Sequence, residues 1–299
     1  MSTSAAFGDI AQCIIFMSES MTSFCFYSSE DPIARVIQAN PRKHVCVISM
    51  QEFIEEVQVF DVIDTEGAVV SWLFDGRTLS SQQQVLLLNR NHGIARGYFN
   101  RLSSVDDSYC ISELYAYLGF ALSVFEHLNK VVTPYGQDPF YDLPIQWSLM
   151  MSMGLAVPTY YWGDPRFNPL KGEDIIFSES HNIYKWRNKK NDTDDKDRVI
   201  DFCFRRPVGD PIFVLIVGQC GMAVCGRTRS IIRCTTVLEI AIQVAEKLDL
   251  FVGEAVFFRN NRSGEYVFGA MSSRINFTST IDGFETVVLK GLSYAAFYK

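Results

Sequence analysis

Two arginines separated by a single residue form the most chemically suggestive pair in this chain of 299 residues. Arg227 and Arg229 flank a threonine, and a strand over these residues would point both guanidinium groups to the same face. Paired guanidinium groups can hold a phosphate or a carboxylate through charged hydrogen bonds. The neighbouring sequence is apolar and offers few acids to pair with them. An anion clamp and a solvated sheet face both explain the pair, and both interpretations stay open.

The histidines and cysteines form no catalytic or metal-binding pattern. Only four histidines occur, without a serine- or cysteine-centred motif, which disfavours a hydrolase triad. The eight cysteines include no Cys-x-x-Cys spacing, and most lie in apolar runs such as 45–47 and 202–204. We therefore expect reduced core thiols in a cytoplasmic protein, and the catalytic residues stay unknown.

Composition indicates a globular and acidic protein. Hydrophobic residues make up 48% of the chain and charged residues 20%, which excludes a disordered chain. The formal net charge is −7, and a negative surface repels phosphate backbones, so we expect no nucleic-acid partner. No signal peptide is visible and no apolar run reaches about eighteen residues, so we expect no membrane association.

The first half of the chain predicts an α/β lobe. Its expected strands cover residues 24–27, 44–50, 56–62, 68–74, 84–89 and 130–133, and its expected helices cover 31–39, 112–128 and 144–153. The strand–helix–strand start favours a parallel sheet with an antiparallel edge. Polar and apolar residues alternate over 56–62, which is typical of a half-exposed strand.

The second half predicts strands arranged around one helix. The strands cover residues 174–177, 199–204, 212–217, 254–259 and 266–270, and the helices cover 236–248 and 282–297. Thr236 and Glu239 match a capping box at the start of the first helix. Two prolines and a glycine within 207–211 predict a turn.

The ordered set of short motifs resembles the ATP-grasp superfamily, in particular the branch of ribosomal-protein glutamate ligases and peptide-modifying ligases. In that branch a strand with Asn-Arg precedes a long helix, as Asn100 and Arg101 do here. Segments of the type Ser-Lys-x-x-Gln and Gly-x-x-x-Pro-Thr follow, matched by residues 142–146 and 154–159. The family's interdomain strand, turn and next strand correspond to residues 205–218.

The resemblance covers about residues 22–299 and implies an α/β fold with two domains. Residues 22–160 would form an N-terminal α/β domain like those that precede an ATP-grasp domain. Residues 161–299 would form a compact α+β ATP-grasp-like domain with a shortened lid, because the segment between Phe177 and Val199 is short for the family's phosphate-covering loop.

Several cations that the family uses for nucleotide phosphates are absent. Two lysines should fall near Leu143 and Ser178, and an arginine should fall near Phe213. Other cations in the second half could compensate. On the resemblance we expect Arg205, Arg206 and Lys185 to be candidates for nucleotide binding, and Arg227, Arg229 and Arg274 for an anion or substrate.

The resemblance also implies a magnesium site, which is incomplete. Glu254 fills the place of one ligand, although a plain carboxylate at a sheet edge would explain it equally. Ala270 and Ser272 stand where the next strand should supply a carboxylate and an amide. Mg²⁺ prefers charged oxygen ligands, so a single carboxylate would make a weak site.

Two functions follow from the resemblance. One is an ATP-dependent carboxylate–amine ligase that acts on a peptide or an amino acid with ATP and Mg²⁺. The other is a catalytically eroded pseudoenzyme without a cofactor, which binds a small molecule, a peptide or a partner protein. Fold precedent favours the first and the missing residues favour the second, because fold alone does not establish function. Either protein could form homo- or hetero-oligomers.

Overall fold

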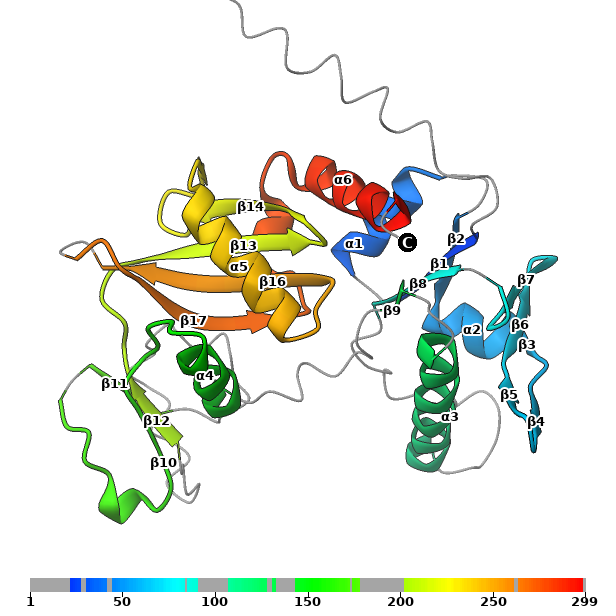
Figure 1. Ribbon diagram of the computed structural model, residues 1–299, viewed down its shortest axis with the longest axis horizontal. Coiled ribbons are helices and arrows are strands. Elements are labelled where there is room, and N and C mark those ends of the chain that lie inside the picture. Colours follow the sequence, from blue (N-terminus) through cyan, green and yellow to red (C-terminus); the bar gives the residue numbers. More distant parts are fainter. Residues whose placement is uncertain are drawn as a thin grey trace, which may run out of the picture. The chain divides into compact units, whose positions relative to one another are not determined.

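The computed structural model describes residues 22–27, 31–41, 45–83, 85–90, 107–127, 131–132, 143–172, 174–177, 202–260 and 263–297. The chain forms two compact units, whose elements are labelled in Figure 1. The first unit comprises Met1–Gln137, Gly218–Cys220 and Glu285–Lys299, and the second comprises Asp138–Val217 and Gly221–Phe284.

A four-stranded parallel sheet lies at the centre of the first unit. Its order is β2-β1-β8-β9, formed by β1 (Thr22–Tyr27), β2 (Val45–Ser49), β8 (Val85–Arg90) and β9 (Val131–Val132). Helix α1 (Pro32–Ala39) begins as predicted, because Asp31 accepts a hydrogen bond from the Ala34 N–H at 2.9 Å. The expected antiparallel edge is wrong for the described strands of this sheet, since the antiparallel strands pair among themselves.

Those antiparallel strands form two small sheets. One contains β3 (Gln58–Val59), β6 (Ser71–Phe74) and β7 (Arg77–Ser80), and the other contains β4 (Val62–Asp64) and β5 (Gly67–Val69). Trp72 anchors the first sheet, since its ring lies edge-on to Phe53 and Phe125 and its Nε1–H donates to the Tyr117 hydroxyl at 2.7 Å. The prediction of a single half-exposed strand over 56–62 is wrong, because two strands pair with different partners there.

Two further helices complete the first core. Helix α2 (Met50–Glu56) begins with a capping box between Ser49 and Glu52, which the sequence reading missed. Helix α3 (Asp107–His127) confirms the predicted long helix. It buries Leu118, Ala121, Leu122 and Phe125 against the sheet that contains Trp72.

A five-stranded sheet dominates the second unit. Its order is β15-β14-β13-β16-β17, formed by β13 (Asp210–Val217), β14 (Cys220–Cys225), β15 (Ile231–Ile232), β16 (Val252–Arg259) and β17 (Tyr266–Ser272). Helix α5 (Thr235–Lys247) lies across one face (Figure 1). Its buried Val237 and Val244 share a core with Ile212, Val214 and Ile216 of β13.

A helix and a smaller sheet join this core. Helix α4 (Leu143–Ser152) precedes a three-stranded antiparallel sheet of β10 (Tyr160–Trp162), β12 (Phe202–Arg205) and β11 (Ile175–Phe177). Trp147 of α4 packs against Phe202 and Phe204, and its Nε1–H donates to the Gly269 carbonyl at 2.7 Å. This single side chain therefore links α4 to both sheets. The remaining elements are η1 (Pro165–Phe167), η2 (Thr278–Thr280) and α6 (Phe284–Phe297).

The predicted capping box at the start of α5 is wrong. The helix begins at Thr235, its N-cap is Cys234, and no side-chain cap is present there. The N-cap therefore lies two residues before Thr236, the expected N-cap, and the Cys234 Sγ lies 2.9 Å from the Tyr266 hydroxyl. Thr236 is therefore already inside the helix.

None of the helices in the described part of the chain combines the length and apolar character that a membrane crossing requires.

Candidate functional site

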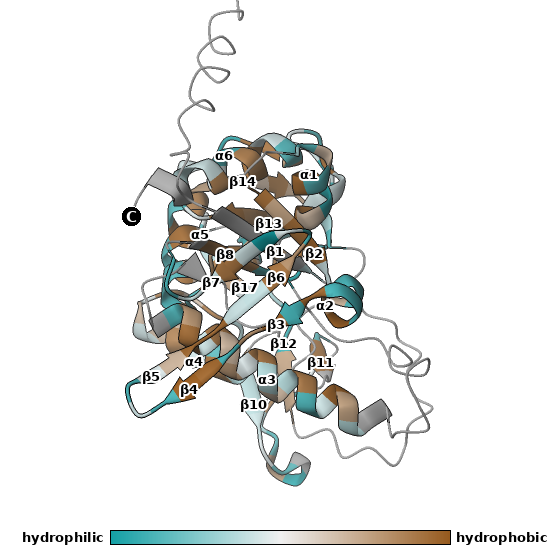
Figure 2. Ribbon diagram, turned by 90° about the vertical axis from the view of Figure 1, so that its right-hand side faces the viewer, coloured by the Kyte–Doolittle hydropathy of each residue, from teal (hydrophilic) through white to brown (hydrophobic). Residues whose placement is uncertain are grey.

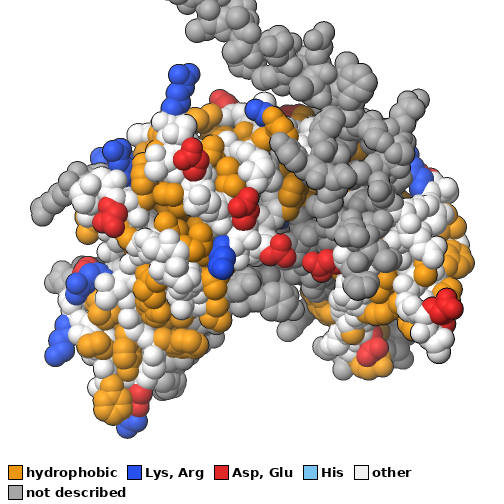
Figure 3. Space-filling view, in the orientation of Figure 1, with side chains coloured by type: hydrophobic (Ala, Val, Ile, Leu, Met, Phe, Trp, Pro, Cys, Tyr) orange, Lys and Arg blue, Asp and Glu red, His pale blue; other side chains and the backbone are white. Residues whose placement is uncertain are grey.

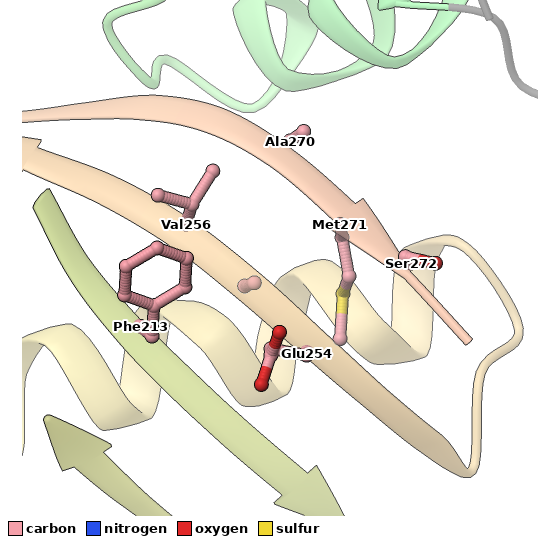
Figure 4. A pocket seen from close by; sticks show the side chains of 7 residues that line it. Phe213, Glu254, Val256, Ala270, Met271 and Ser272 are labelled. Carbon is pink, nitrogen blue, oxygen red and sulfur yellow. The ribbon is translucent and has the colours of Figure 1, made fainter. Parts of the chain in front are cut away.

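Glu254 and the positions where the resemblance expects further magnesium and phosphate ligands lie on one face of the five-stranded sheet. Glu254 of β16 is paired with Ser272 of β17, and Val256 with Ala270 and, on its other side, with Phe213 of β13. Cross-strand partners project to the same face of a sheet, and alternation places all five side chains on the face opposite α5. Figure 4 shows Phe213 and Glu254 in front of the strands with the helix behind.

This face contains a small pocket (Figure 4). About 180 Å³ of space, open solvent included, lies among its lining residues, which are Phe213, Glu254, Ala255, Val256, Ala270, Met271 and Ser272. Glu254 supplies the only charged side chain of this lining, so the pocket is small and largely apolar.

The carboxylate of Glu254 is held by the chain itself. The residue is 3% exposed, and its Oε1 accepts hydrogen bonds from the backbone N–H groups of Asn276 at 3.3 Å and Phe277 at 3.1 Å. Its Oε2 accepts from the N–H of Phe277 at 3.1 Å and from both the N–H and the hydroxyl of Thr278 at 2.7 Å. These five hydrogen bonds join β16 to the segment that follows β17.

An aromatic stack fixes the same segment above the pocket. The rings of Phe213 and Phe277 lie parallel within 15°, with their centroids 4.1 Å apart. The Arg229 guanidinium lies 5.2 Å from the centroid of the Phe277 ring, a cation–π arrangement, and donates to the Thr280 hydroxyl at 2.5 Å. Phe277 of residues 276–280, which we call the 276–280 segment, therefore contacts Phe213, near which the resemblance expects an arginine.

The placement of residues 227–229 on a strand is wrong. These residues lie between β14 and β15, where the Cys225 N–H donates to the Ser230 carbonyl and the Arg229 N–H to the Cys225 carbonyl. Arg229 adopts a left-handed backbone with φ of 56°. The alternation of a strand does not apply in this tight loop, so the predicted common face for Arg227 and Arg229 is not formed.

The other candidate cations lie on separate elements. Arg205 ends β12 and forms an ion pair with Asp174 at 3.1 Å, with each side chain about half exposed. Arg206 is exposed beside it, and its N–H donates to the Asp174 carbonyl. Arg274 is exposed after β17, and its N–H donates to the Ser272 hydroxyl at 3.0 Å.

Lys185 lies outside the described residues. On the face shown in Figure 3, the blue Lys and Arg side chains are scattered and do not gather into one patch.

As arranged, the residues of this face do not fit a magnesium–phosphate site. Mg²⁺ demands a near-octahedral set of oxygen ligands, whereas both oxygens of Glu254 are already engaged and the side chains of Phe213 and Ala270 contain no oxygen. Over the described residues, no group of three or more His, Cys, Asp or Glu side chains could hold a metal ion. The metal role of Glu254 therefore stays a prediction from the resemblance.

Comparisons with known proteins identify solved structures that share this architecture. No protein-family model matches the sequence, and no curated protein matches it. Among solved structures, the ATP-grasp ligase PsnB, complexed with precursor peptide PsnA2 and AMPPNP, matches with a TM-score of 0.65 over 93% of this chain and 97% of PsnB, at 18% identity.

The chain has the ATP-grasp fold. Two further ATP-grasp structures match with TM-scores of 0.61. One is a RiPP-associated ligase from Chryseobacterium gregarium in complex with ADP and a leader and core peptide, at 10% identity over 91% of this chain and 95% of that one. The other is the macrocyclase MdnC from Microcystis aeruginosa MRC bound with precursor peptide MdnA, at 12% identity over 93% of this chain and 100% of MdnC.

These matches confirm the family resemblance at the level of the fold. An ATP-grasp fold at such identities leaves the chemistry to be argued from the site.

Proposed function

We propose that this ATP-grasp-fold chain binds a polypeptide and does not carry out conventional ligation with Mg-ATP. The observation that carries the proposal is the carboxylate of Glu254, which accepts five hydrogen bonds from the 276–280 segment of its own chain. Both oxygens of this carboxylate already accept hydrogen bonds from the chain, so a cation would have to displace these donors in order to bind.

The composition of the face supports the absence of phosphoryl transfer. Transfer of a phosphoryl group builds negative charge on oxygens, which cations must neutralise. Phe213 occupies the place expected for an arginine, and Ala270 and Ser272 occupy the places expected for magnesium ligands. Phe213 is moreover stacked on Phe277, so the face is apolar where an active ligase needs charge.

The polypeptide ligand is supported by the structures that share the fold. PsnB, MdnC and the Chryseobacterium gregarium ligase are each described in complex with a peptide. This chain shares the fold of these peptide complexes over almost its whole length, although it lacks the charged residues expected for nucleotide binding. The shared fold supports a peptide-binding role. We therefore place a peptide, or an extended segment of a partner protein, first among the ligand classes.

A working ligase is the rival function. It would use ATP and Mg²⁺, with Arg205, Arg206 and Lys185 on the nucleotide and Arg227, Arg229 and Arg274 on an anion or substrate. This function requires the 276–280 segment to release Glu254 before the cation binds.

The two functions are separated by measuring ADP formation from Mg-ATP by the full chain, with and without a synthetic peptide library, alongside Glu254→Ala. We expect ADP formation no greater than that of the variant under either condition, together with saturable binding of individual library peptides measured by fluorescence anisotropy. Peptide-stimulated ADP formation that disappears in Glu254→Ala would overturn the proposal, as would the absence of any saturable peptide binding.

A further inference from the structure

The β4–β5 hairpin of the first unit and the residues that lead into it from β3 expose several apolar side chains. Ile63 is 69% exposed, Val62 58%, Phe60 56% and Val59 44%. Figure 2 shows β4 in the brown of hydrophobic residues, followed by a teal turn. Single exposed apolar side chains are ordinary, but four within five residues, interrupted only by Asp61, indicate an interaction surface.

The hairpin is a formed structure. Val62 is paired with Val69 and Ile63 with Ala68, and the Asp64 Oδ1 accepts hydrogen bonds from the N–H groups of Glu66 at 2.7 Å and Gly67 at 3.1 Å. The turn is thereby closed by an aspartate side chain, a typical role for this residue. The apolar side chains are therefore presented on a fixed backbone.

The base of the hairpin is tied to the core of its unit. The Phe60 N–H donates to the Ser71 carbonyl at 2.9 Å, and the Ser71 N–H donates to the Asp61 carboxylate at 3.3 Å. Ser71 begins β6, whose Trp72 is 1% exposed. The hairpin is thus held by a buried anchor, while Val62 and Ile63 remain exposed.

The backbone of β4 also has a free edge. Within the described part of the chain, β4 and β5 form a sheet of two strands and pair only with each other. A sheet edge presents N–H and C=O groups that a further strand can pair with, and native proteins usually protect such edges. An apolar edge that is left open fits strand addition by a partner.

The negative charge around the hairpin indicates which kind of partner could bind it. Residues 55–69 contain five acidic residues and no Lys or Arg. Two copies of the hairpin would bring these acids against one another, which disfavours self-association, whereas a basic segment would be attracted. We propose that the β4–β5 hairpin binds an extended, basic polypeptide segment, which adds as a strand to the edge of β4 and covers Val62 and Ile63. This surface belongs to the first unit and Glu254 to the second, and the proposal does not depend on the proposed function.

The test measures binding of the full chain to a labelled peptide in which Lys alternates with Val, by fluorescence anisotropy. Ile63→Ser is expected to weaken binding by about tenfold or more, because one buried aliphatic side chain is lost. Phe167→Ser is the matched control, since Phe167 is 75% exposed but lies in the other unit. A peptide with N-methyl groups on alternate residues, which cannot pair as a strand, is expected not to bind.

Salt and the variant Glu66→Gln test whether the acidic residues of the hairpin attract the basic peptide. Raising NaCl from about 0.1 M to about 1 M shortens the Debye length from ~10 Å to ~3 Å and should weaken binding, less so for Glu66→Gln. Equal binding to the wild type and Ile63→Ser, binding of the N-methylated peptide, or no binding of the Lys-Val peptide would each overturn the proposal. A dimer in sedimentation velocity that Ile63→Ser dissociates would also overturn it, since the hairpin would then join two copies.

Discussion

Thr278 donates two hydrogen bonds to the same carboxylate oxygen of Glu254, one from its N–H and one from its hydroxyl, each at 2.7 Å. This contact joins η2 to the first half of β16, on the face where the resemblance expects magnesium. Glu254, which the resemblance predicts to be a metal ligand, thus holds the 276–280 segment of its own chain.

The first prediction concerns this anchor. Glu254→Gln should lower the free energy of unfolding by about 2–3 kcal/mol, because hydrogen bonds to a charged acceptor are lost and an amide NH₂ then faces backbone donors. Thr278→Val, which removes only the hydroxyl donor, should lower it by about 1 kcal/mol. Urea denaturation followed by circular dichroism measures both. If Glu254→Gln unfolds at the wild-type urea concentration, the carboxylate is not an anchor.

The second prediction concerns a buried ion pair in the first unit. Arg90 donates to the Asp31 carboxylate from Nη2 at 2.8 Å and from Nε at 3.1 Å, and both side chains are 1% exposed. Arg90→Met should lower the free energy of unfolding by about 3–5 kcal/mol, because it leaves a buried carboxylate without its cation. Urea denaturation again provides the measurement.

Arg166→Met is the matched control for this pair, since Arg166 forms an ion pair with Asp164 at the surface. That variant should unfold at the same urea concentration as the wild type. Similar losses from the two substitutions would contradict the account of the buried pair.

The third prediction concerns thiol reactivity. Hydrogen bonds from Thr228 hold the pKa of the Cys225 thiol below its usual range, whereas burial raises the pKa of the Cys46 thiol to about 11. A lowered pKa means that the thiolate, the reactive form, predominates at a lower pH. Alkylation by iodoacetamide, followed by peptide mass spectrometry across pH, should therefore rise for Cys225 at lower pH than for Cys46.

Thr228→Val removes the hydroxyl donor, so the alkylation profile of Cys225 should move to higher pH. The profile of Cys46 should not move in this variant. A Cys225 profile that is unchanged by Thr228→Val would show that the hydroxyl does not set its reactivity.

The sequence predicted most helices and strands because their periodicity is strong and local. The strands β13, β16 and β17 match their expected ranges within two residues, and the long helix α3 begins five residues earlier than expected; the order of the elements indicated the ATP-grasp fold. The sequence-based predictions were wrong where contacts between distant residues determine the local structure. The hydrogen bonds across 225–230 turn the Arg227 region into a loop, and pairing with β5 and β6 divides the strand expected over 56–62.

The site could be predicted only in part. Glu254, Ala270 and Ser272 were identified as a group, and the strand register places them on one face. The partners of Glu254 were not foreseen, because most of them are backbone N–H groups of the 276–280 segment, which have no signature in the sequence. A side chain's identity therefore indicated where the site lies, but not what the side chain binds.

The most direct test of the central claim is the melting temperature of the full chain with and without millimolar Mg-ATP. A ligand present at a hundred times its Kd would stabilise the folded state by about 2.7 kcal/mol and raise the melting temperature measurably. We predict no shift, because Glu254 is engaged by Thr278 and its neighbours Phe213 and Ala270 carry no charge. A magnesium-dependent rise that Glu254→Ala abolishes would contradict the account.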